Sequence, residues 1–218
     1  MLILLVSTVL CSFEFNKYVM HMTGLPPNDG NPYIVMLHSD GCSHCVRLAP
    51  TWASAAELGV GVAQFAELDC GLNRTACQEV KTDGVPRILY FRNSKVMEYE
   101  GMQISRLIVN WASELLEDTA IFVGKDNYSQ LITDNAAILF TNKNPIPKVW
   151  ASIERYLNDP KIKFFVSSDV ELQKMLNLNA FPGVYVKKGQ DIVSYSDKIA
   201  AIPFRNFVDD LYRREKEL

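Results

Sequence analysis

Short apolar runs and amphipathic stretches alternate along the chain, and their order occurs twice. In the first half, β-rich apolar runs and a turn at Asn93-Ser94 predict four strands, at 33–37, 61–69, 85–91 and 95–101. Apolar residues at helical spacing predict helices at 42–58, 74–81 and 104–116. Pro50 lies inside the first of these helices and is expected to kink it.

The second half repeats this order. Its predicted strands are 120–124, 136–142, 161–167, 181–189 and 191–197. Its predicted helices are 147–157, 170–178 and 204–218, and Asp169 is placed to cap the second of them. Two stretches of about 100 residues with a shared β-α-β-α-β-β-α order predict one α/β fold used in tandem, with a boundary near 117–120.

The first twelve residues, "MLILLVSTVLCS", differ from the rest because they form a short and almost continuous apolar run. This length is typical of a secretory signal peptide, with cleavage near Cys11 or Ser12, and lies far below the roughly 20 residues of a membrane span. A buried N-terminal strand is the alternative. No later run is long enough for a membrane helix, so we expect no membrane span.

Composition and charge narrow the function classes. The chain is 48% hydrophobic and 22% charged, which is typical of a globular protein. Its formal net charge is −3, whereas a nucleic-acid-binding protein normally presents a basic face. We therefore expect no nucleic-acid partner.

Four cysteines remain once Cys11 is assigned to the signal peptide. An even number of cysteines in a chain entering an oxidising compartment favours disulfide chemistry. A zinc site is the alternative, but the spacing is C-x2-C, then 24 residues, then C-x6-C, and structural zinc sites usually pair two short knuckles. We expect neither a metal nor an organic cofactor. The four are Cys42, Cys45, Cys70 and Cys77.

The segment "HSDGCSHCVRLAPTW" combines a preceding strand, a Cys-x-x-Cys motif at a helix start and a proline five residues later. This arrangement resembles the thioredoxin superfamily, and "CSHC" differs by one residue from the Cys-Gly-His-Cys motif of protein disulfide isomerases. The segment "LDCGLNRTACQEVKTDGVPRILYF" is similar to the same branch. The resemblance implies a catalytic thioredoxin-like domain at 13–118.

Residues 119–218 resemble the non-catalytic thioredoxin-like domain of that family. They contain no cysteine and have Phe181-Pro182 at the position corresponding to Val85-Pro86. The implied fold is a tandem of thioredoxin-like domains, each a central mixed sheet flanked by helices. At Val85-Pro86 the family places a cis-proline beside the redox motif, which implies that these two residues bind substrate.

Roles for the motif residues follow from helix electrostatics. A helix N-terminus carries free N–H groups and the positive end of the helix dipole, which lower the pKa of a thiol placed there. Cys42 is therefore the expected attacking thiolate, and Cys45, one turn later, the resolving thiol. Protonated His44 would stabilise the reduced form further and make the disulfide more oxidising. A role for His44 as an exposed polar residue is the alternative.

Two further features follow from the resemblance. Some isomerase-type domains carry a structural disulfide at the positions of Cys70 and Cys77; two free buried thiols are the alternative. The C-terminal "EKEL" resembles the Lys-Asp-Glu-Leu retrieval signal and implies the lumen of the endoplasmic reticulum. Asn73 and Asn127 each begin a glycosylation sequon.

Three positions depart from the family pattern. Met36 stands where the family has a buried acidic residue that assists the resolving thiol, and Gly41 stands where it has a tryptophan. Neutral Gln103 lies near the position of a distal arginine. These departures predict slower turnover with the thiol chemistry retained, and Met36→Glu is expected to speed release of a mixed disulfide.

The expected function is thiol–disulfide exchange on unfolded or misfolded secretory polypeptides, recycled by glutathione or a lumenal thiol oxidase. The second domain could add an apolar client-binding surface. A redox-assisted chaperone with little isomerase turnover is the first alternative. The quiescin sulfhydryl oxidases share "CxHC…APTW", but they need a flavin-binding helical module for which this chain has no room.

Overall fold

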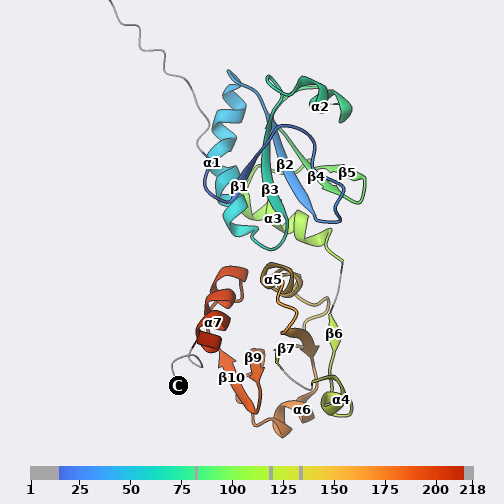
Figure 1. Ribbon diagram of the computed structural model, residues 1–218, viewed down its shortest axis with the longest axis vertical. Coiled ribbons are helices and arrows are strands. Elements are labelled where there is room, and N and C mark those ends of the chain that lie inside the picture. Colours follow the sequence, from blue (N-terminus) through green and yellow to red (C-terminus); the bar gives the residue numbers. More distant parts are fainter. Residues whose placement is uncertain (1–14, 82, 118–119, 133–134, 214–218) are drawn as a thin grey trace, which may run out of the picture. The chain divides into compact units, whose positions relative to one another are not determined.

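The computed structural model describes residues 15–81, 83–117, 120–132 and 135–213 (Figure 1). The chain divides into two compact units. The first unit comprises Met1–Gly59 and Ala63–Ala112, and the second comprises Val60–Val62 and Ser113–Leu218. The predicted signal peptide, the "EKEL" tail and residues 118–119 at the predicted boundary lie outside the described residues.

The first unit is built on a mixed five-stranded sheet in the order β1-β3-β2-β4-β5. Strands β1, β3 and β2 are parallel, whereas β4 is antiparallel to β2 and β5 to β4. The strands are β1 (Val19–Met22), β2 (Tyr33–His38), β3 (Gln64–Asp69), β4 (Arg87–Arg92) and β5 (Lys95–Glu98). The helices are α1 (Ser43–Leu58), α2 (Arg74–Glu79) and α3 (Ser105–Glu114).

Helices cover both faces of this sheet, so its central strands are apolar on both sides. On one face, Cys77 of α2 packs with Val35 and Leu37 of β2. On the other face, α1 places Trp52 against Phe65 of β3, with ring centroids 5.1 Å apart. Helix α1 runs unbroken through Pro50.

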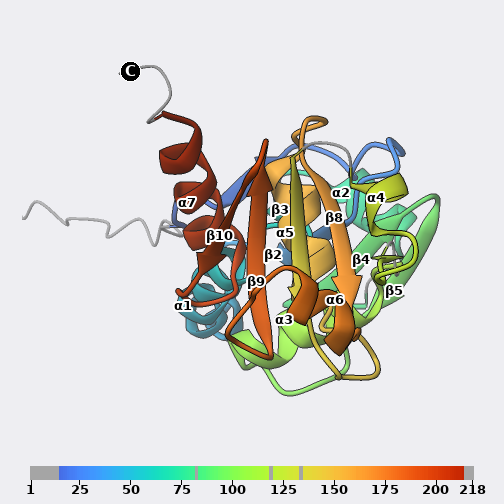
Figure 2. The same ribbon diagram turned by 90° about the horizontal axis from the view of Figure 1, so that it is seen from below.

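The second unit repeats the mixed sheet, in the order β10-β9-β7-β8-β6 (Figure 2). Its parallel strands are β6 (Ile121–Phe122), β7 (Ala136–Phe140) and β8 (Lys163–Ser167), and its antiparallel strands are β9 (Gly183–Lys188) and β10 (Asp191–Tyr195). Its helices are α4 (Tyr128–Leu131), α5 (Val149–Leu157), α6 (Val170–Met175) and α7 (Ala201–Arg213).

An aromatic cluster fills the core on one face of the second sheet. Trp150 of α5 and Phe204 of α7 pack there with Phe164 of β8. The indole Nε1 of Trp150 donates to the Phe165 carbonyl oxygen at 3.1 Å, so the ring is buried without losing its hydrogen bond. The opposite face is covered by α4 and α6.

The predicted tandem of mixed-sheet α/β folds is confirmed. Asp169 caps α6 as expected, and its side chain accepts from the backbone N–H of Glu171 at 2.8 Å and of Leu172 at 3.1 Å. Two elements of four residues each, β1 and α4, were not predicted. Of the helices in the described residues, none combines the length and apolarity that crossing a bilayer requires.

Candidate redox site

The Cys-x-x-Cys motif lies where β2 ends and α1 begins. Gly41 makes the turn between them at a φ of 77°, a left-handed conformation that strains residues with a β-carbon. Glycine is therefore favoured at a position where the resembling family has tryptophan. Cys42 is the N-cap of α1 and is joined by a disulfide to Cys45, with their Cα atoms 5.3 Å apart.

The two sulfurs have different environments. Cys45 is fully buried, whereas Cys42 is half-buried and is the more accessible of the two. The backbone N–H of Cys45 points at the Cys42 Sγ, with an N···S distance of 3.1 Å. In the reduced protein the same N–H and the helix N-terminus can stabilise a thiolate on Cys42.

The loop before β4 lies against this disulfide. The Val85 carbonyl oxygen is 3.7 Å from the Cys42 Sγ, and the Val85–Pro86 peptide bond is cis. The structure thus brings together Cys42, Cys45, Val85 and Pro86 from two elements that are more than 40 residues apart in sequence, since Cys42 and Val85 are separated by 43 positions.

His44 is exposed on the first turn of α1 and contacts a cation that the sequence reasoning missed. The Arg47 Nη2 donates to the Nδ1 of His44 at 2.9 Å. Nδ1 therefore serves as an acceptor in this contact, and a fixed positive charge lies beside the motif. The signal was available in the sequence, because residues three apart on a helix are neighbours. The electrostatic role of His44 itself stays a prediction.

A second disulfide joins Cys70, which follows β3, to Cys77 on α2, with a Cα–Cα distance of 5.7 Å. The Cys70 N–H donates to the His38 carbonyl oxygen at 2.7 Å, so this disulfide loop is attached to the end of the strand that precedes the motif. All four described cysteines are thus in disulfides. In the ranges that the structure describes, no group of three or more potential ligands is arranged to hold a metal ion.

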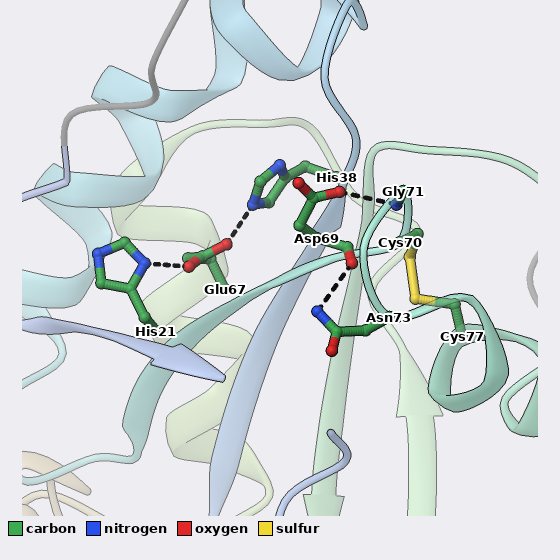
Figure 3. A network of polar contacts seen from close by, with 8 residues as sticks. All are labelled: His21, His38, Glu67, Asp69, Cys70, Gly71, Asn73 and Cys77. Carbon is green, nitrogen blue, oxygen red and sulfur yellow. Dashed lines mark hydrogen bonds and ion pairs between the residues drawn. A yellow bond between two sulfur atoms is a disulfide. The ribbon is translucent and has the colours of Figure 1, made fainter. Parts of the chain in front are cut away.

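The two sequons lie in different settings. The Asn73 Nδ2 donates to the Asp69 carbonyl oxygen at 3.1 Å, so the nitrogen that would carry a glycan is already engaged (Figure 3). At Asn127 it is the Oδ1 that is engaged, accepting from the Gly124 N–H at 2.8 Å. Modification at either position stays a prediction, and Asn127 is the better placed.

A buried ionic network in the first unit was also missed from the sequence. Glu67 of β3 hydrogen-bonds through one carboxylate oxygen to His21 of β1 and through the other to His38 of β2 (Figure 3). Glu67 and His38 are 5% and 4% exposed. Burial by itself raises the pKa of Glu67, but the hydrogen bonds and charges of His38 and His21 outweigh it and hold the pKa below its ordinary value.

Met36, the first departure from the family pattern, is fully buried in β2. It is paired in register with Glu67 of the neighbouring strand β3. The strand register therefore places an acidic side chain beside a position that cannot itself titrate. Gln103 is exposed in the loop before α3.

The comparisons with known proteins agree with this fold. A model of the thioredoxin family matches residues 8–114. A Schizosaccharomyces pombe protein named as a putative protein disulfide-isomerase is 29% identical over 171 residues, covering 76% of this chain and 34% of that protein. DnaJ homolog subfamily C member 10 of Xenopus laevis is 29% identical over 108 residues, covering 49% of this chain and 14% of that protein.

Among solved structures, a crystal structure of ERdj5 (form I) superposes with a TM-score of 0.68 at 17% identity. The match covers 88% of this chain and 28% of that one, and it shows the shared fold. The chain therefore spans about a third or less of the length of each of these three proteins.

Proposed function

Because this chain belongs to the protein disulfide isomerase family of the thioredoxin superfamily, we propose that it is a thiol–disulfide oxidoreductase acting through Cys42 and Cys45. The observation that carries this proposal is the asymmetry of the pair. The accessible sulfur, that of Cys42, receives a helix N-terminal N–H, and its partner, Cys45, is fully buried behind it. Such an arrangement favours a stable thiolate at the first position and an intramolecular attack from the second.

The exchange proceeds in two steps. The Cys42 thiolate attacks one sulfur of a substrate disulfide, forming a mixed disulfide and releasing the other substrate sulfur as a thiolate. Cys45 then loses its proton and attacks the Cys42 Sγ, which forms the Cys42–Cys45 disulfide and releases the second substrate sulfur, also as a thiolate. The substrate is reduced by two electrons and the motif is oxidised by two. The reverse sequence oxidises a substrate dithiol, so the same residues serve both directions.

A substrate surface is formed by the loops at the motif edge of the first sheet. Strands β2 and β3 end at this edge and β4 begins there, which brings the loops after β3 and before β4 close to Cys42. Leu72 in the first of these loops is 82% exposed. An exposed apolar side chain at this edge of the sheet is of the kind that binds unfolded polypeptides.

The proposed setting is the lumen of the endoplasmic reticulum, with unfolded or misfolded secretory polypeptides as clients. Glutathione or a lumenal thiol oxidase would return the motif to its working redox state. Support comes from the sequence of the predicted signal peptide and of the "EKEL" segment and from similarity to proteins named as protein disulfide-isomerases.

The test is reactivation of a scrambled-disulfide substrate in a glutathione buffer, comparing the wild type with Cys42→Ser. We expect the variant to fall to the background rate of the buffer, because no other described cysteine has an accessible sulfur at a helix N-terminus. Equal rates for the two proteins would overturn the proposal.

A second candidate function is client binding without turnover, as in a redox-assisted chaperone. The specific observation in its favour is exposed apolar surface, since Met102 in the loop before α3 is 67% exposed in addition to Leu72. Suppression of client aggregation that survives Cys42→Ser while reactivation is lost would show that both activities reside in this chain.

A further inference from the structure

A buried carboxylate bridges two histidines across three parallel strands of the first unit. His21, Glu67 and Met36 lie side by side in register on β1, β3 and β2, and His38 is two residues after Met36 on the same face. Glu67 contacts both imidazoles, His21 through Nδ1 and His38 through Nε2 (Figure 3). We call His21, Glu67 and His38 the His–Glu–His row.

The second unit builds the same sheet without any of these charges. The cis-prolines allow the two sheets to be aligned. The residue two positions after the cis-proline is Ile88 in the first unit, which pairs with Met36, and Val184 in the second, which pairs with Leu139. Met36 and Leu139 are therefore equivalent positions. Along the second register, Val166 occupies the place of Glu67 and Phe122 that of His21. Thr141, two residues after Leu139, corresponds to His38.

This difference separates a structural role from a chemical one. An ionised carboxylate placed inside a protein costs free energy unless it is paired, and apolar residues at the same positions are commonly as stable. The second unit shows that the fold accommodates apolar residues at two of the three positions. The row therefore accompanies the thiols and is not required by the sheet.

The row lies on the face of the sheet that receives Cys45. Helix α1 returns antiparallel to β3 and places Trp52 on Phe65. Cys45 is seven residues earlier, which is about 10 Å back along the helix. Toward the end of the sheet that carries the motif, Glu67 lies about 7 Å beyond Phe65 along β3. His38 of β2 pairs with Asp69, which lies about 13 Å beyond Phe65. Cys45 is thus level with the space between Glu67 and His38.

The two ends of the row differ in their access to water. The side chains of Glu67 and His38 are 7% and 5% exposed, whereas that of His21 is 73% exposed. The bridging carboxylate therefore joins a histidine buried at the level of Cys45 to one in solvent. Imidazole is the side chain that gains and loses protons most readily near neutral pH.

We propose that His38, Glu67 and His21 form a proton relay between Cys45 and solvent, and this inference rests on the proposed function above. When Cys45 attacks the mixed disulfide, its thiol proton passes to the His38 ring, which gives a proton through Nε2 to the Glu67 carboxylate. His21 already donates its Nδ1 hydrogen to this carboxylate and so does not take the proton there. As Glu67 loses its negative charge, a protonated His21 gives the hydrogen of its other ring nitrogen to water, so one proton leaves the row for each one that enters. The Cys45 thiolate forms the new S–S bond, and the substrate sulfur departs with the electron pair. In the reverse reaction the protons move inward.

Several titratable groups lie on the elements packed around Glu67. On this face of the first sheet they are His21 on β1, His38 on β2, Asp69 on β3, Tyr90 on β4 and the thiol of Cys45 on α1. Asp69 is engaged by the Gly71 N–H at 2.7 Å. The charged residues Arg106 and Glu114 of α3 are exposed to solvent. The two histidines are the ionisable groups that contact the Glu67 carboxylate.

The test separates formation of the mixed disulfide from its release. Full-length protein with the Cys42–Cys45 pair reduced is mixed with oxidised glutathione and quenched in acid. Peptide mapping then follows glutathione on Cys42 and its conversion to the Cys42–Cys45 disulfide, between pH 6 and 9. Glu67→Gln should slow release at least about tenfold at pH 7, the lower end of typical acid–base contributions, and leave formation unchanged. The deficit should shrink toward pH 9, where hydroxide removes the Cys45 proton directly.

Matched variants distinguish the relay from a loss of packing. Glu79→Gln changes an exposed carboxylate on α2 and should leave both steps unchanged. His21→Asn alters the solvent end of the row without burying anything new, so it decides the question if Glu67→Gln does not fold. It should slow release several-fold, again most at low pH. Unchanged release in folded variants, or slowing that is equal at every pH, would overturn the relay. No glutathione on Cys42 in the wild type would instead refute the proposed function.

Discussion

The first and second units arrange five strands in the same order, β1-β3-β2-β4-β5 in one and β6-β8-β7-β9-β10 in the other. Each has a cis-proline directly before its first antiparallel strand, Pro86 before β4 and Pro182 before β9. The loop between the second strand and the following helix carries Cys42 in the first unit, whereas the corresponding loop from β7 to α5 has Pro145 and Pro147 and no thiol.

A second difference lies inside the sheets. The first unit keeps Glu67 between two histidines, and the second has Val166 at the equivalent place. The comparison shows that apolar patterning and strand order suffice for the fold. The accessible thiol and the buried charge occupy positions where the fold also accommodates other residue types. Substitutions confined to one unit at a time test this comparison.

The largest effect is expected from emptying the core of the second unit. Phe204 is fully buried on α7 among aromatic neighbours, so Phe204→Ala should destabilise this unit by about 3–5 kcal/mol. Hydrogen exchange measured by mass spectrometry should report lost protection in β7 and β8, with β2 and β3 unaffected. Equal loss of protection in both sheets would show that the units unfold together.

The next effect concerns the disulfide that the second unit lacks. Replacing Cys70 and Cys77 by alanine should lower the free energy of unfolding of the first unit by about 2–3 kcal/mol, because the disulfide closes a short loop in the unfolded chain. Urea unfolding measures this change. Disulfide exchange by the folded fraction should persist, and its complete loss would assign the second pair a catalytic role.

Acid should affect the first unit through Glu67. Its folded-state pKa lies below the ordinary value of 4.5, so its ionised form stabilises the fold above that pH, and the contribution is lost as pH falls through the lowered folded-state pKa. Glu67→Gln should cost about 1–3 kcal/mol at pH 7, as expected for hydrogen bonds to a charged group. In urea titrations the gap between wild type and variant should hold down to pH 4.5 and narrow only below it. A gap that is constant with pH would contradict this account.

The smallest effect is expected at a helix cap in the second unit. Asp169 accepts from two N–H groups of α6, whereas Asn73, the N-cap of α2 in the first unit, makes no side-chain capping bond. Asp169→Ala should therefore cost about 1 kcal/mol, and Asn73→Ala less, in matched urea titrations. Hydrogen bonds from the Lys125 and Leu172 N–H groups hold the pKa of Asp169 below its ordinary value, so the cost should decrease in acid.

The sequence predicted the repeated strand and helix order because alternation and helical spacing of apolar residues are local signals. It also predicted that Cys42 and Cys45 are at a helix start, since the motif is contiguous. The His–Glu–His row was not predicted. Its members lie on three strands far apart in the sequence, and Glu67 reads locally as the polar residue of an alternating strand, so only the cross-strand register reveals that it is buried beside Met36.

The division of labour between Cys42 and Cys45 is tested most directly by trapping the mixed disulfide. Cys45→Ser and Cys42→Ser, each reduced at the motif, are incubated with a disulfide-bonded peptide, quenched in acid and mapped. The account predicts that the peptide accumulates on Cys42 and persists in Cys45→Ser, and that Cys42→Ser reacts little because Cys45 is buried. Equal labelling of Cys45 in Cys42→Ser, or no labelling of Cys42 in Cys45→Ser, would contradict it.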